Sequence, residues 1–154
     1  MSSLFRVFPN DPTPPFVDYA DGVYVFTKSG KKLLDTTAGG TSYSILGWNH
    51  SEGNSAIQDQ LKKFSHLDYK LWSDSHTEEL AELLLSKAEH SLDRVYFSGN
   101  SGAEACEAAM KMSYQVHYDL GKPQKKWFIS REQSYHGSTA DALALGERPN
   151  LEFF

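Results

Sequence analysis

The sequence contains a single cysteine, Cys106, among 154 residues, so no disulfide can form within one chain. A lone thiol is typical of a protein kept in a reducing compartment, and we expect a cytoplasmic location. No apolar run approaches the length of a membrane span, and the first residues lack the apolar core of a secretory signal. The sequence therefore predicts neither a membrane protein nor a disulfide-stabilised one.

Positive charge is also scarce. The chain has 15 basic and 20 acidic residues, which gives a formal net charge of −5. A nucleic acid or an anionic membrane surface is a poor partner for such a chain. The six histidines are scattered, and no Cys/His cluster has metal-ligand spacing, so no metal site is expected.

The rest of the composition, 40% hydrophobic and 23% charged residues, is that of a soluble globular protein. The pattern predicts a hairpin with a turn at Ser29-Gly30 and three helices. The helices are expected over about 55–64, from a capping box of Ser75 and Glu78, and from about Gly102 to Gly121. Short strands are expected at 94–98, 126–130 and 151–154. Alternating strands and helices predict an α/β fold with a parallel sheet.

The stretch FSGNSGAEACEAAMKM, residues 97–112, runs from a strand-like segment into small residues and then a helix. The first turn of a helix has unpaired N–H groups and partial positive charge, so an uncluttered one can hold a phosphate. Ser101, Gly102 and Ala103 meet that requirement. The alternative is a tight turn packed on a sheet, which the small residues alone slightly favour. Neither G-x-G-x-x-G nor a Walker loop is present, so a nucleotide site is weakly supported.

A second stretch, FISREQSYHGSTADALALG at 128–146, places Tyr135 and His136 just after another predicted strand. Ligands gather at the carboxyl ends of parallel strands. A phosphate cradle after one strand and an aromatic face after the next would suit a phosphorylated flat ring. Taken alone, Tyr135 is more often a packing residue and His136 a local hydrogen-bonding residue.

Together these motifs resemble the class III aminotransferases, pyridoxal-phosphate enzymes of fold type I. The resemblance lies in RVYFSGNSGAEACEAAMKMSYQVHY (94–118), KWFISREQSYHGST (126–139), GKKLLDTTAGGTSYSILGWNH (30–50) and HTEELAELLLS (76–86). It covers nearly the whole chain in the expected order. It implies the α/β fold type I architecture, with residues 1–66 as an N-terminal arm and part of the small domain. Residues 67–154 would then be the first part of the large, cofactor-binding domain.

The resemblance also implies roles for individual residues. Ser101, Gly102 and Ala103 would bind the cofactor phosphate, Tyr135 would stack on the pyridine ring, and His136 would lie beside it. The substrate-pocket residues would be Thr41, Trp48 and Trp72, partly across the interface of a homodimer. Two positions depart from the usual GHxHP pattern: Trp48 stands for its first histidine and Ser51 for its proline. The sequence therefore does not determine the shape of that loop.

The reaction implied is amino-group transfer from an amine or amino acid donor to a keto acid or aldehyde acceptor. Such chemistry needs a lysine that holds the cofactor covalently and a carboxylate on its ring nitrogen. None of the eleven lysines fits that role by motif, and the resemblance places the lysine beyond residue 154. The chain is expected to be the first part of something longer, and the 154 residues alone are expected to be inactive.

Two alternatives remain open from the sequence. Aminomutases, decarboxylases and racemases of the same family share these N-terminal motifs. A non-catalytic remnant that binds phosphate, or pairs with a full-length relative, would also carry them.

Overall fold

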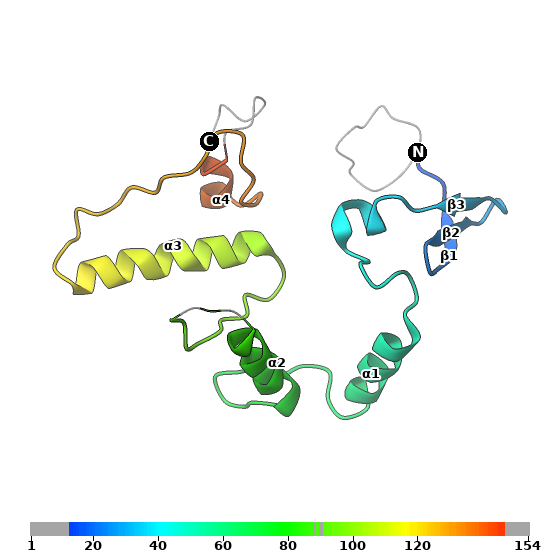
Figure 1. Cartoon of the computed structure of the whole chain (residues 1–154), viewed down its shortest axis with the longest axis horizontal. Helices are drawn as coiled ribbons and strands as arrows, with labels where there is room; N and C mark the ends of the chain where they lie inside the picture. The colour runs from blue at the N-terminus through cyan, green and yellow to red at the C-terminus, as the bar shows by residue number, and fades with distance from the viewer. Residues whose placement is uncertain (1–12, 88, 90, 147–154) are drawn as a thin grey trace. The chain divides into compact units, whose positions relative to one another are not determined.

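The computed structural model describes residues 13–87, 89 and 91–146. The chain divides into two units, Met1–Ser73 and Asp74–Phe154, and Figure 1 shows the helices and strands of each. The domain boundary expected after residue 66 stays a prediction.

The first unit is built on a small antiparallel sheet of strands β1 (Val17–Asp21), β2 (Tyr24–Thr27) and β3 (Lys32–Leu34), in that order. The predicted hairpin is confirmed, since β2 pairs antiparallel with β3. Its turn contains Gly30 at φ +82°, a left-handed conformation that glycine adopts without a steric penalty. Strand β1 was not predicted. It is held on β2 partly by Tyr19, whose ring stacks on that of Phe26 with 4.4 Å between centroids.

Two helical elements follow in this unit, a π-helical turn η1 (Ala38–Ser42) and helix α1 (Ser51–Leu61). Helix α1 begins four residues earlier than the expected start at Ser55. The cause is a cap that periodicity cannot reveal: the His50 ring Nδ1 accepts the amide of Gly53 at 3.1 Å. That bond satisfies one of the unpaired donors of the first turn.

The second unit begins with helix α2 (Ser75–Ser86), as expected from the sequence. Its predicted cap was wrong, however. Asp74, not Ser75, is the N-cap, and its carboxylate accepts the amides of His76 at 3.0 Å and Thr77 at 3.2 Å. A carboxylate at this position also interacts favourably with the helix dipole.

The long helix α3 (Gly102–Asp119) is followed by the short helix α4 (Ala140–Ala144), and the two are in contact (Figure 1). Helix α3 begins and ends where the sequence predicted. Its buried residue is Met110, whereas Met112 and Val116, which helical periodicity predicts for one apolar face with Ala105 and Ala109, are exposed. The reason is that α4 is the described element that packs on α3, and it covers a different strip of the helix.

The strands predicted at 94–98 and 126–130 are a further correction, because neither is hydrogen-bonded as a strand. Within the described ranges no other segment pairs with their backbones. Trp127 and Ile129 are consequently 93% and 99% exposed. The segment 126–130 is instead anchored through Phe128, whose ring meets the Tyr114 ring edge-on with the ring centroids 5.2 Å apart. The strand predicted at 151–154 lies outside the described residues.

Of the helices that the structure describes, none combines the length and the apolar character needed to cross a bilayer.

The capping arrangement of α2 gives a first prediction. Replacing Asp74 with alanine removes the acceptor for two amides, and we expect a loss of about 1 kcal/mol in the free energy of unfolding. Ser75→Ala is the matched control and is expected to cost only a few tenths of that amount. Urea unfolding of the full-length protein measures both. A larger loss for Ser75→Ala would mean that the serine is the effective cap.

Candidate functional site

The first turn of α3 is the centre of the candidate site. Ser101 is the N-cap, and its hydroxyl oxygen accepts the Glu104 amide at 3.3 Å. Gly102 and Ala103 are the first two residues of the helix, and their amides have no acceptor inside it because helical bonds run back four residues. A Cβ added at Gly102 would meet no atom within 4 Å. This turn therefore presents free donors on an open side, which is what an anion requires.

The Glu104 side chain turns back from this first turn toward the preceding loop. Its Oε2 accepts the amide of Asn100 at 2.9 Å, and it lies 3.5 Å from where a Cβ of Gly99 would be. A negative carboxylate thus occupies the loop side of the helix start. An anion would be repelled there, so the side of Gly102 is the one left for it.

The second predicted stretch lies directly against this turn. Gly137 has φ +144°, and a Cβ on it would overlap the Ala103 Cβ and stand 2.7 Å from the Ala103 Cα. It would also come within 3.0 Å of the Ala142 Cβ. Any larger residue at 137 would push the loop away. The structure therefore brings the SGA and YHG segments together, as the sequence predicted.

Tyr135 and His136 extend from this contact. Tyr135 is 60% exposed, and its hydroxyl lies 3.2 Å from the Ser138 hydroxyl. The Nε2 atom of His136 is buried and has no hydrogen-bond partner in the part of the chain that the structure describes. A buried polar atom without a partner is costly, and a polar group of a bound ligand would satisfy it. These features fit a phosphorylated aromatic ligand.

Two residues near the site were missed by sequence reasoning. Glu104 stands three positions after Ser101, the spacing of a capping box, so its role could have been found. Glu107 accepts the amides of Asp141 and Ala142, which lie 34 and 35 residues further along the chain. No local pattern signals a partner at that separation.

The first unit contains a separate polar cluster centred on Asp35. One oxygen of its carboxylate accepts the Thr37 amide at 2.9 Å and the Thr37 hydroxyl at 2.8 Å. The other accepts the Gly39 amide at 2.6 Å and the Trp48 indole N–H at 2.8 Å. These bonds, with that of the Thr37 amide largest, lower the pKa of Asp35 from 3.8 to about 2. The loop from Asp35 to Trp48 is thereby closed on one ionised carboxylate.

The predicted substrate-pocket residues all belong to this first unit. Trp48 joins the Asp35 cluster and also pairs with Gly22 through backbone bonds of 3.0 and 2.7 Å. Trp72 is exposed, and its amide donates to the Asp68 carbonyl at 3.0 Å. Thr41 lies within η1. Their role in a pocket stays a prediction, while Trp48 has an observed structural role in closing its loop.

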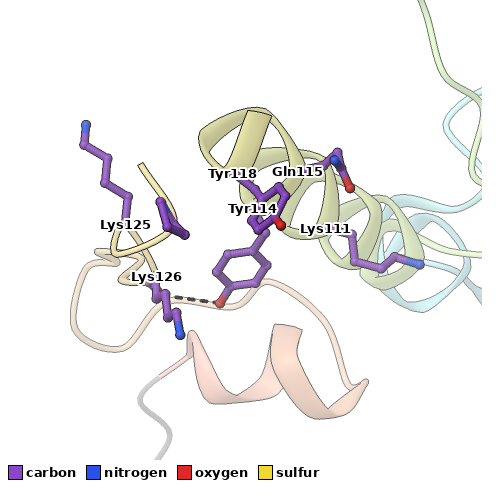
Figure 2. Close-up of a pocket in the computed structure, with 7 residues that line it drawn as sticks. Lys111, Tyr114, Gln115, Tyr118, Lys125 and Lys126 are labelled. Carbon is purple, nitrogen blue, oxygen red and sulfur yellow. Dashed lines mark hydrogen bonds between the residues drawn. The ribbon is translucent and has the colours of Figure 1, made fainter. Parts of the chain in front are cut away.

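An open groove of about 610 Å³ lies along the second half of α3, away from the predicted cofactor residues (Figure 2). It is lined by Pro123 and by Lys111, Tyr114, Gln115, Tyr118, Lys125 and Lys126. Figure 2 shows the three lysine side chains pointing in different directions, so their ammonium groups do not converge on one ligand position. Elsewhere, the described residues contain no group of three or more His, Cys, Asp or Glu that could hold a metal ion.

Comparison with known sequences gives a consistent result. The family described as aminotransferase class-III matches residues 8–152. An uncharacterized aminotransferase of Schizosaccharomyces pombe is 36% identical over 143 residues, which is 93% of this chain and 30% of that protein. The acetylornithine aminotransferase of Agrobacterium fabrum is 36% identical over 152 residues, 98% of this chain and 36% of that protein. The chain thus spans about a third of the length of these relatives.

Solved structures give the same picture. The omega transaminase of Pseudomonas jessenii in complex with PMP matches with a TM-score of 0.84 and 31% identity, over 97% of this chain and 35% of that one. A PLP-bound aminotransferase mutant from Vibrio fluvialis matches with a TM-score of 0.80 and 28% identity, over 89% of this chain and 30% of that one. This likeness confirms the predicted fold class, an α/β segment of the fold type I architecture.

The Asp35 cluster predicts a pH dependence. Because folding lowers the Asp35 pKa from 3.8 to about 2, its stabilising contribution is fully present above about pH 4. It should be lost as the pH falls through the folded value near 2. We expect the loop from Asp35 to Trp48 to open in that window, which the Trp48 indole N–H resonance and loop amide exchange would report.

Asp35→Asn is the matched variant for this titration, since an amide cannot accept all four bonds and does not titrate. Its loop should be more open at neutral pH and insensitive to acid between pH 5 and 2. An unchanged acid midpoint in Asp35→Asn would assign the titration to another group.

Proposed function

Since this chain belongs to the class III aminotransferases, whose cofactor is pyridoxal phosphate, we propose that it takes part in pyridoxal-phosphate-dependent amino transfer. The donor would be an amine or amino acid, and the acceptor a keto acid or aldehyde. The observation that carries the proposal is the contact of Gly137 with Ala103, which brings the segment that contains Tyr135 and His136 to an open helix start.

The phosphate would be held at the first turn of α3. The amides of Gly102 and Ala103 would donate to its oxygens, with the partial positive charge of an 18-residue helix behind them. The Ser101 oxygen accepts the Glu104 amide, but its hydroxyl hydrogen is still available to donate. Ala103 has no side-chain donor, so its contribution is restricted to the backbone.

The ring of the cofactor would lie on Tyr135. An offset face-to-face contact between two aromatic systems orients the ring while leaving its edges free for chemistry. The unpartnered Nε2 of His136 would pair with a polar group at the edge of the same ligand. Together these residues bind and orient the cofactor and exclude water from one of its faces.

Pyridoxal phosphate, when bound, supplies an aldehyde carbon and an electron-withdrawing ring. The residues described here contribute binding and orientation to that chemistry. Thr41, Trp48 and Trp72 would shape the substrate entrance, with the closed Asp35 loop fixing the position of Trp48.

The proposal includes a homodimer with the active site at its interface, and a cytoplasmic location. The exposed apolar side chains of α1 and α2, such as Ile57 and Leu83, support an assembly that covers more surface than the described chain does. The single cysteine is compatible with a reducing compartment. Light scattering of the full-length protein and cell fractionation test these two points.

Amino transfer itself is tested by incubating the full-length protein with pyridoxal phosphate, a simple amine, and pyruvate or 2-oxoglutarate. Formation of the amino acid that corresponds to the acceptor is the expected result. Carbon dioxide release, a shifted amino group or inversion of the donor would point instead to one of the related chemistries.

The phosphate assignment is tested at Gly102. In Gly102→Asp the carboxylate would stand beside the anion, and we expect pyridoxal phosphate binding to fall by at least about a hundredfold, the effect of a like charge at close range. Titration of the cofactor absorbance measures the dissociation constant.

Gly102→Ala is the matched control, because an added Cβ meets nothing within 4 Å and the helix tolerates alanine. Its affinity should stay within about threefold of the wild type, less than the effect of one hydrogen bond to a charged group. Unchanged binding in Gly102→Asp would remove the phosphate from this turn.

A further inference from the structure

Helix α4 is capped by a side chain from another helix. It has five residues, Ala140–Ala144, and its own N-cap residue, Thr139, makes no side-chain capping bond. The Glu107 Oε1 of α3 instead accepts the amide of Asp141 at 3.1 Å and that of Ala142 at 3.3 Å. One carboxylate thus satisfies two of the donors that the first turn of a helix leaves unpaired.

This bond fixes one end of the segment that leads to the aromatic residue. At the other end, Gly137 is buried against Ala103. Ala142, at the end that Glu107 holds, is completely buried. The segment from 137 to 142 is therefore held on α3 at both ends.

The loop that carries Tyr135 is also closed on itself. The Ser134 hydroxyl donates to the Leu145 carbonyl at 3.4 Å, and a Cβ on Gly146 would stand 2.7 Å from the Ser134 carbonyl oxygen. Residues 134–146 therefore form one closed unit, and α4 is the part of it that Glu107 holds. A displacement of α4 would be transmitted to Tyr135 through this unit.

We propose that Glu107 is a positioning residue for the cofactor: it holds α4 on α3 and thereby sets the position of the segment that carries Tyr135, which contacts the first turn of that helix through Gly137. This inference rests on the proposed function, since the ring is taken to stack on pyridoxal phosphate. The Glu107 carboxylate acts through the backbone of α4, where it accepts the amides of Asp141 and Ala142.

The charge of Glu107 is consistent with this role. The Thr139 hydroxyl beside the carboxylate, followed by the amides of Ala142 and Asp141, holds its pKa below the ordinary value. The two hydrogen bonds, however, require an acceptor oxygen that reaches the amides of Asp141 and Ala142, and not a negative charge. A neutral side chain of the same length therefore distinguishes positioning from a general electrostatic effect.

The test is a series of variants in the full-length protein: Glu107→Gln, Glu107→Asp and Glu107→Ala, with Glu82→Ala on the exposed surface of α2 as control. Glutamine keeps an acceptor at the same reach, whereas aspartate keeps the charge but is one methylene too short. In the apoprotein, the backbone amides of residues 141 and 142 should exchange with solvent faster in Glu107→Asp and Glu107→Ala than in Glu107→Gln and the wild type. This readout needs no cofactor.

Cofactor binding is then measured by titration and by the circular dichroism of bound pyridoxal phosphate. We expect the dissociation constant of pyridoxal phosphate to rise about tenfold in Glu107→Asp and Glu107→Ala, as for loss of a hydrogen bond to a charged group. It should stay within about threefold in Gln and in Glu82→Ala. The cofactor dichroism should fall in Asp and Ala, because the ring is no longer held in one orientation.

The other outcomes overturn the proposal in different ways. If Glu107→Asp behaves as the wild type and Glu107→Gln does not, cofactor binding depends on the charge of the side chain and not on its length. If α4 loosens but affinity and dichroism are unchanged, Glu107 does not position the ring, although the proposed function stands. If wild type binds no pyridoxal phosphate, the proposed function fails together with this inference. Should Glu107→Ala not fold, Gln and Asp alone decide.

Discussion

The approach of residue 137 to the first turn of α3 depends on the absence of a side chain there. Gly137 stands so close to Ala103 that even one methyl group would overlap it. This contact joins the segment that contains Tyr135 and the buried Ala142 to the first turn of α3. Packing at van der Waals distance is rigid, so the aromatic residue has a defined place relative to the open helix start.

Four carboxylates of the described residues hold local structure by accepting backbone amides. Asp35 closes a loop, Asp74 caps α2, Glu104 accepts the amide of Asn100 in the loop before α3, and Glu107 caps α4. Each ionised oxygen stabilises donors that would otherwise be unpaired. Among the described residues, no carboxylate is hydrogen-bonded to the amides of Gly102 and Ala103.

Sequence reasoning succeeded where the signal was local. The glycine-lined start of α3, its end at Gly121 and the hairpin turn at Gly30 each depend on residues a few positions apart. The sequence predicted that the segments around Ala103 and Gly137 meet at the ends of parallel strands; they do meet, but without those strands. The strands at 94–98 and 126–130 were wrong as paired strands, because a strand needs a neighbouring backbone and none of the described segments provides one. Glu107 was missed for the related reason that its partners are remote in sequence.

The cap on α4 has a consequence for the order in which the second unit forms. A helix of five residues is too short to be stable alone, since nucleation costs more than so few bonds return. Helix α3, with 18 residues, can form from local contacts, but α4 needs the carboxylate that α3 presents. Closing the long loop between them also costs entropy before any contact is gained. The aromatic residue should therefore reach its place late, after the helix start beside it already exists.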